Sequence, residues 1–172
     1  MKSTVSLFAL TLLIPAASAQ DTPSLSPEHA VLKRNLGTRT GIMKLWVSPD
    51  ADPIEMPVTE KVSSILGGFW AEAEFESGPY KGKGVTGYDP IKKKFVGTWS
   101  SNVSPHLIMM EGTLNDSKDE LTMHFTEVNP ADGTSTAMKS VTTFTPGKPE
   151  TFAMYRKADG KWQKQFVVTY KE

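Results

Sequence analysis

Clusters of turn-forming residues divide most of this sequence into short runs, and their close spacing limits how the chain can fold. Each cluster contains Gly, Pro, Asn or Asp, the residues that most readily reverse the backbone. The clusters occupy residues 48–53, 67–68, 77–82, 89–93, 102–105, 115–119, 129–133, 146–149 and 158–161. The runs between them are rich in β-branched, aromatic and aliphatic residues, which are typical of strands. We therefore predict about ten strands, beginning near residues 38, 55, 69, 83, 94, 106, 120, 135, 150 and 161.

Connections this short allow each strand to pair with the preceding one in the antiparallel direction. About ten strands exceed what an open twisted sheet usually carries, and a flat sheet would leave two unpaired edges. Closure into a barrel removes both edges. A β-sandwich is the alternative, but it needs long crossovers, and no connection here is long enough to make one convincingly. We predict an all-β fold: an antiparallel up-and-down barrel of about ten strands, preceded by one short helix.

The short helix is predicted in the segment SPEHAVLKRNLG, residues 26–37. Ser26 is suited to cap it, Pro27 to occupy its first position and Gly37 to end it. Its apolar stripe would fit a helix of about three turns. We expect His29, in the first turn, to lie at the surface.

The N-terminus has the three-part pattern of a secretory signal over residues 1–19. One positive charge precedes an apolar run at residues 5–14, and small residues follow at 17–19. We predict cleavage after this segment, which leaves a single barrel domain at residues 20–172. The run is too short to span a bilayer, so no transmembrane segment is expected after cleavage. The expected location is periplasmic or secreted, in a bacterium.

The charges balance, with 19 Lys and Arg against 19 Asp and Glu, and the chain has no cysteine. A chain that is neutral as a whole has no electrostatic footprint for nucleic acid or for an anionic membrane, and no nucleic acid is expected as a partner. Without cysteine there is no disulfide, no lipid-attachment thiol and no thiol chemistry. The domain must therefore be held together by its core.

Five segments occur in a characteristic order: EHAVLKRNLGT (28–38), GGFW (67–70), GYDPIKKKFVGTWSS (87–101), PHLIMMEGTL (105–114) and VTTF (141–144). Together they resemble a bacterial family catalogued as domain-of-unknown-function family 1579. The resemblance implies a calycin-like or lipocalin-like barrel, related in shape to fatty-acid-binding and nitrobindin-type haem barrels, with no established activity. Such proteins commonly have tryptophan after the first-strand Gly-Thr, where it packs across the closed end of related barrels. Here Arg39 stands at that position, and Trp46 is a candidate to supply the missing bulk.

His106 and His124 are the two histidines that a hairpin would bring nearest to each other. With the turn centred near Ser117, residue 110 would oppose 124, which puts the two histidines ~13 Å apart along the strands. That distance is too long for a shared zinc ion, so we predict no metal site and no cofactor. The resemblance to nitrobindin-type barrels leaves haem on a single histidine as an alternative, without a matched ligand position. Because His106 follows Pro105, we expect it at the rim of the barrel.

The segment FWAEAEFE, residues 69–76, alternates between apolar and mainly acidic positions. One face carries Phe69, Ala71, Ala73 and Phe75, and the other carries Trp70, Glu72, Glu74 and Glu76. Alternating acids are typical of a solvent-exposed strand face, which is the favoured interpretation. Acids inside the barrel would need partners, and Arg39 and Arg156 are the candidates.

Late strands supply the other polar candidates. Fatty-acid-binding barrels hold a ligand carboxylate with arginine and tyrosine from late strands, so the resemblance points to Tyr155, Arg156 and Tyr170. Arg156 directly precedes a turn, which favours a position at the rim.

The leading hypothesis is a non-enzymatic binding protein whose interior holds a small apolar or amphipathic molecule. The interior is expected to be lined by some of Trp70, Trp99, Met110, Met123, Phe125 and Phe152. The candidate ligand-binding residues are Trp70, Trp99, His106, Met110, His124, Tyr155 and Arg156. No catalytic residue is assigned. Two alternatives stay open: a barrel-type enzyme using His106 or His124 with a carboxylate, and a packed interaction module without a cavity.

Overall fold

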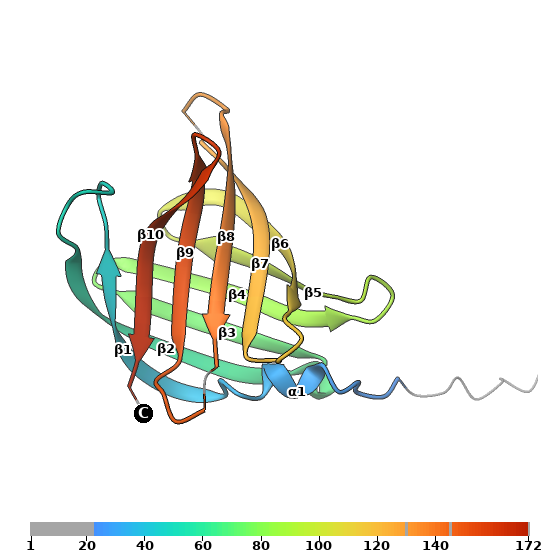
Figure 1. Cartoon of the computed structure of the whole chain (residues 1–172). Coiled ribbons are helices and arrows are strands. Elements are labelled where there is room, and N and C mark those ends of the chain that lie inside the picture. The colour runs from blue at the N-terminus through green and yellow to red at the C-terminus, as the bar shows by residue number, and fades with distance from the viewer. Residues whose placement is uncertain (1–22, 130, 145, 172) are drawn as a thin grey trace, which may run out of the picture.

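The computed structural model describes residues 23–129, 131–144 and 146–171. The elements are α1 (His29–Leu32), β1 (Gly37–Leu45), β2 (Ile54–Ile65), the 3-10 turn η1 (Leu66–Gly68), β3 (Trp70–Ser77), β4 (Tyr80–Asp89), β5 (Lys94–Ser101), β6 (Ser104–Leu114), β7 (Glu120–Val128), β8 (Ser135–Thr143), β9 (Thr151–Ala158) and β10 (Lys161–Tyr170). Each strand is antiparallel to the next, and β1 pairs with β10, which closes the sheet into a barrel (Figure 1). The predicted all-β up-and-down barrel is confirmed.

Every strand begins within three residues of its predicted start. The turn clusters account for this agreement, because each one ends a strand and reverses the chain. The largest difference is at β4, which was expected from residue 83 and begins at Tyr80. Gly78 has a φ of +55°, so it reverses the chain within two residues and lets β4 start earlier. The signal predicted at residues 1–19 lies outside the described residues.

The N-terminal helix differs from its prediction in length and in its cap. It is a single turn, and no side chain caps it; the Ser26 hydroxyl instead lies 3.0 Å from Nδ1 of His29. His29 is 3 % exposed and not at the surface as expected. Its ring packs edge-on against Phe69 and Tyr88, with ring centres 5.4 and 5.9 Å away. Packing against the barrel therefore decides the shape of this segment, and the prediction of three turns was wrong.

One end of the barrel, which we call the helix end, is covered by α1 and the residues after it (Figure 1). Arg34 donates a hydrogen bond of 2.8 Å to the backbone carbonyl of Lys118, in the β6–β7 connection. Phe95 is among the most deeply buried side chains, at 1 % exposed. The buried cluster here consists of Val31, Leu32, Val62, Ala71, Phe95, Leu121 and Met123. Side chains thus fill the barrel at the helix end.

The opposite end, which we call the open end, has no helix over it in the described part of the chain. It is formed by strand connections, including residues 78–79, 102–103 and 159–160. A second buried cluster lies between the two ends and consists of Met43, Val58, Phe75, Val168 and Tyr170. The apolar side chains packed against this cluster are only partly buried: Met56, Tyr80, Trp99, Phe152 and Phe166. Val58 and Val168 in this cluster are 2 % and 0 % exposed, and half-buried apolar side chains also pack against the first cluster. Side chains therefore pack the interior at both levels, and the half-buried ones occur along the whole inner wall.

Candidate functional site

The inner wall toward the open end is lined by aromatic and methionine side chains. The strand register places Met110 opposite Phe125, and Phe125 opposite Met138. Alternation along each strand puts these residues on the same face as the buried Met123, so they point into the barrel. Further inward-facing side chains on this wall are Trp99, Phe152, Met154 and Phe166. Met138 is buried, and the others are half-buried.

Trp99 lies flat against the inner wall, and two glycines make room for it. A Cβ atom on Gly82 or Gly84 would collide with the Trp99 ring. Only glycine therefore fits at these two positions of β4 beneath the ring. The indole Nε1 donates a hydrogen bond of 2.9 Å to the hydroxyl of Tyr80. The Tyr80 ring in turn packs edge-on against Phe75, with ring centres 6.1 Å apart. The orientation of Trp99 is therefore fixed by packing on one side and by a hydrogen bond at its polar end.

The structure divides the predicted ligand-binding residues between the two faces of the wall. Trp99 and Met110 point inward, and His106 and Arg156 occupy inner-face positions near the open end, where both are exposed. Trp70, His124 and Tyr155 lie on the outer face. Of the other residues expected to line the interior, Met123, Phe125 and Phe152 point inward.

Trp70 lies outside because it alternates with the buried Ala71. It packs on Gly87, where a Cβ atom would collide with the Trp70 ring. The acidic residues Glu72 and Glu74 share its face, and both pair with Lys83 at 3.0 and 3.3 Å. The favoured interpretation of residues 69–76 as a strand with a solvent-exposed acidic face is thus correct.

The two hairpin histidines point to opposite sides of the wall. The predicted register was off by one residue, because Glu111, not residue 110, opposes His124. His106 occupies an inner-face position on β6, whereas His124 lies on the outer face of β7. Among the described residues, neither histidine side chain bonds to a carboxylate, and no group of three or more His, Asp or Glu side chains is placed to hold a metal ion. The histidine–carboxylate pair of the enzyme hypothesis is therefore not formed in the described residues.

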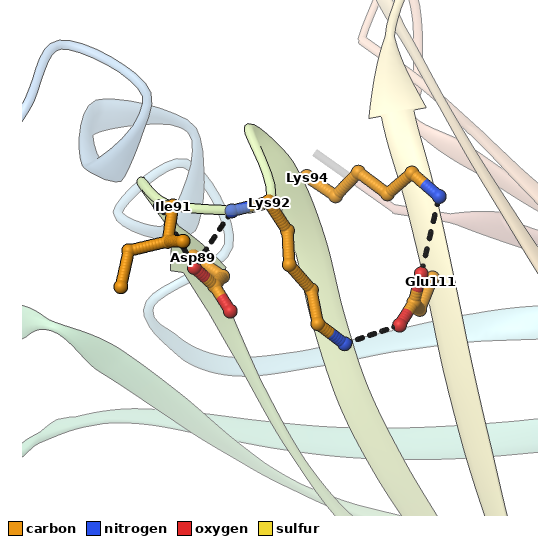
Figure 2. Close-up of polar contacts among 5 residues, drawn as sticks. All are labelled: Asp89, Ile91, Lys92, Lys94 and Glu111. Atoms are coloured by element: carbon orange, nitrogen blue, oxygen red, sulfur yellow. Dashed lines mark hydrogen bonds and ion pairs between the residues drawn. The ribbon is translucent and has the colours of Figure 1, made fainter.

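A polar network covers the outer wall beside His124. Lys92 and Lys94 reach Glu111 from two sides, at 2.5 and 3.1 Å (Figure 2). Their hydrogen bonds lower the pKa of Glu111 below its ordinary value. The groove here has a volume of about 440 Å³, but it lies in open solvent, and its charges are already paired with each other. Surface ion pairs of this kind contribute little to stability.

A cluster of charged residues that the sequence did not predict lies inside the wall near the helix end. Arg39 donates from Nε to Glu60 at 2.7 Å and from Nη1 to Glu150 at 2.5 Å. Its guanidinium carbon stands 3.6 Å from the ring centre of Tyr170. We call these four residues the arginine cluster. Trp46 does not replace the missing tryptophan: it lies at the opposite end of β1, where its backbone N–H bonds to Gln165.

The arginine cluster carries two carboxylates and one guanidinium, and burial changes the pKa of Glu150 and of Tyr170. Burial is the largest cause that raises the pKa of Glu150, while the positive charge of Arg39 opposes the rise. Burial and then the negative charge of Glu60 raise the pKa of Tyr170, so its hydroxyl stays protonated. The ion pairs with Glu60 and Glu150 leave the Arg39 guanidinium occupied by carboxylates of the protein itself.

Glu150→Gln is expected to remove one contribution that makes the wild-type protein less stable as the pH rises. The folded-state pKa of Glu150 is above its ordinary value of 4.5, so its contribution to stability is complete below pH 4.5. That contribution is lost as the pH rises through the folded-state pKa. Urea denaturation of wild type and E150Q from pH 4 to pH 7 measures the two slopes. Thr113→Ala, at an exposed side chain that carries no charge, is the control and should keep the wild-type slope.

The fold and the inner wall define a class, the closed antiparallel up-and-down barrels. Within it, the chain belongs to the family described as "Protein of unknown function (DUF1579)", whose model matches residues 24–172. A comparison with curated proteins gave no match. Among the described residues, no helix has the length and the apolar character needed to cross a bilayer.

Proposed function

We propose that this protein is a non-enzymatic binder of a small apolar or amphipathic molecule, held in the open half of a calycin-like barrel. The observation that carries the proposal is the incomplete burial of inward-facing Trp99, Met110 and Phe125, while Phe95 near the helix end is buried. Apolar side chains that face the interior and keep part of their surface accessible are what a ligand site in the mouth of a barrel would present. The pattern at residues 1–19 supports a periplasmic or secreted location in a bacterium.

The polar groups of the interior favour a ligand that is largely apolar. Arg39 is held by Glu60 and Glu150, so a ligand carboxylate would have to compete with both for it. Arg156 is exposed near the open end, and its Nη2 is 3.5 Å from Gln163, at the limit of a hydrogen bond. Any charged group of an amphipathic ligand therefore fits best at the rim, with its apolar part inside.

Dye titration with a matched pair of variants tests the site. The dye Nile red should bind wild type in a saturable manner, and Met110→Lys should weaken binding at least tenfold, because it places a charge on the apolar inner wall. Thr113→Lys, on the exposed outer face of the same strand, is the control and should bind the dye like wild type. Native mass spectrometry of the purified protein should show a retained small molecule.

Met110→Trp separates a cavity from a packed core. If the space is empty, tryptophan should fill it without loss of thermal stability and should reduce dye binding. If M110W is destabilised and wild type binds no dye, the interior is packed, and the interaction-module alternative replaces the proposal. Circular dichroism of each variant establishes that the barrel has formed before binding is compared.

A further inference from the structure

Three lysines on the outer face of β8, β9 and β10 lie over aromatic rings. The Lys139 Nζ is 5.2 Å from the ring centre of Tyr155 and 5.1 Å from that of Trp162. The Nζ atoms of Lys157 and Lys164 are 5.9 Å from Trp162 and 6.0 Å from Tyr155. The register produces this array, because Tyr155 lies between Lys139 and Lys164, and Lys157 opposes Trp162. We call these five residues the basic aromatic surface.

The basic aromatic surface differs in its charge balance from the outer faces of β1 and β4. On β1 and β4, Lys44, Lys81 and Lys83 each form an ion pair with a glutamate, at 2.9 to 3.1 Å. Within the described ranges, no ion pair includes a lysine of the basic aromatic surface. Three positive charges are therefore uncompensated on one part of a chain that is neutral as a whole.

Apolar side chains are exposed on the same wall, toward the open end. Trp162 is 36 % exposed, and Leu107 and Met109 are 53 % and 73 % exposed. Alternation with the inward-facing Met110 places Leu107 and Met109 on the outer face of β6. The outer wall from β6 to β10 thus combines positive charge with exposed apolar groups.

We propose that the basic aromatic surface docks this protein on a negatively charged lipid layer. Lysines are attracted to anionic head groups, tryptophan prefers the lipid–water interface, and exposed Leu and Met can enter the acyl boundary. A stacked sugar fits less well, because ammonium groups already lie over the rings of Tyr155 and Trp162. Docking in this way brings the open end close to the lipid. The inference goes beyond the proposed ligand site and does not depend on it.

Vesicle cosedimentation tests the proposal with two triple variants that change the net charge equally. Lys139→Gln, Lys157→Gln and Lys164→Gln together neutralise the basic aromatic surface. Lys44→Gln, Lys81→Gln and Lys83→Gln together are the matched control. Vesicles of phosphatidylglycerol and phosphatidylcholine at low salt should bind wild type and the control, and should bind the surface variant roughly a hundredfold more weakly. Added salt should release the wild-type protein.

Several outcomes would overturn the proposal. The first is that wild type does not bind the anionic vesicles. The second is that both triple variants lose vesicle binding equally. The third is that wild type binds vesicles of phosphatidylcholine alone as well as it binds the anionic vesicles. Equal affinity for soluble polyglutamate would assign the surface to polyanions in general and not to lipid. Nile red titration of the same variants separates the two proposals. If a variant loses vesicle binding but binds the dye like wild type, the effect is on lipid docking alone. If the protein binds vesicles but not the dye, the interior ligand site is contradicted and lipid docking stands.

Discussion

Arg39→Met is expected to lower the free energy of unfolding by about 3–5 kcal/mol at pH 7. The substitution removes the positive charge between Glu60 and Glu150 and leaves two carboxylates without their partner. Their side chains are 13 % and 16 % exposed, so water replaces little of the lost interaction. Urea denaturation of wild type and R39M at pH 7 measures the difference.

The stability should return when the acids of the arginine cluster are neutralised as well. The variant with Arg39→Met, Glu60→Gln and Glu150→Gln removes the charges together, and it is expected to recover most of the loss. Lys44→Met, beside the exposed Glu55, is the matched control and should cost less than about 1 kcal/mol. R39M alone with wild-type stability would mean that the arginine cluster does not help hold β1 in the wall.

Gly112→Ala is expected to destabilise the barrel by about 3 kcal/mol, the largest packing effect we predict. A Cβ atom on Gly112 would overlap the backbone oxygen of Thr122 and lie 2.7 Å from Cα of Met123. Both obstacles are backbone atoms of β7, so relief requires a shift of the β6–β7 ladder. Thermal and urea denaturation of G112A measure the cost.

Gly133→Ala is the control for the Gly112 variant. Nothing lies within 4 Å of a Cβ atom on Gly133, so only its backbone conformation, with φ of +71°, opposes alanine. That strain should cost roughly 1–2 kcal/mol. Equal losses in G112A and G133A would contradict the close approach of β6 and β7 as the cause.

The number, order and direction of the strands could be predicted from local features. A turn cluster such as residues 115–119 acts over a few residues, and its effect does not depend on the rest of the fold. The helix prediction failed for the opposite reason. Contacts of His29 with Phe69 and Tyr88, which are distant in sequence, override the local helix signals.

Which strand face points inward was harder to predict, because many strands carry apolar residues on both faces. The alternation in residues 69–76 already grouped Trp70 with the acids, and this pattern was a better guide than the size of its side chain. For His124, a one-residue error in the β6–β7 register changed the expected neighbour. A shift of one residue in a hairpin reverses every side chain relative to its partner strand.

The arginine cluster could not be derived from local patterns. Glu60 and Glu150 are separated from Arg39 by 21 and 111 positions in the sequence. Glu60 meets Arg39 because β1 pairs with β2, whereas Glu150 lies just before β9 and reaches Arg39 across β10. The available signal was the arginine in the place of the tryptophan of related barrels, which marked the position but did not identify its partners.

The pairing of β1 with β10 also sets the order in which the chain can be completed. Gly41 and Tyr170 are neighbours in this ladder, although almost the whole domain separates them in sequence. During synthesis the N-terminal strand is made first, so one edge of β1 stays unpaired until β10 has been synthesised. The exposed edge is then a target for misassociation, and the long closure slows folding. The interior is therefore enclosed only in the last step, when the C-terminal strand is added.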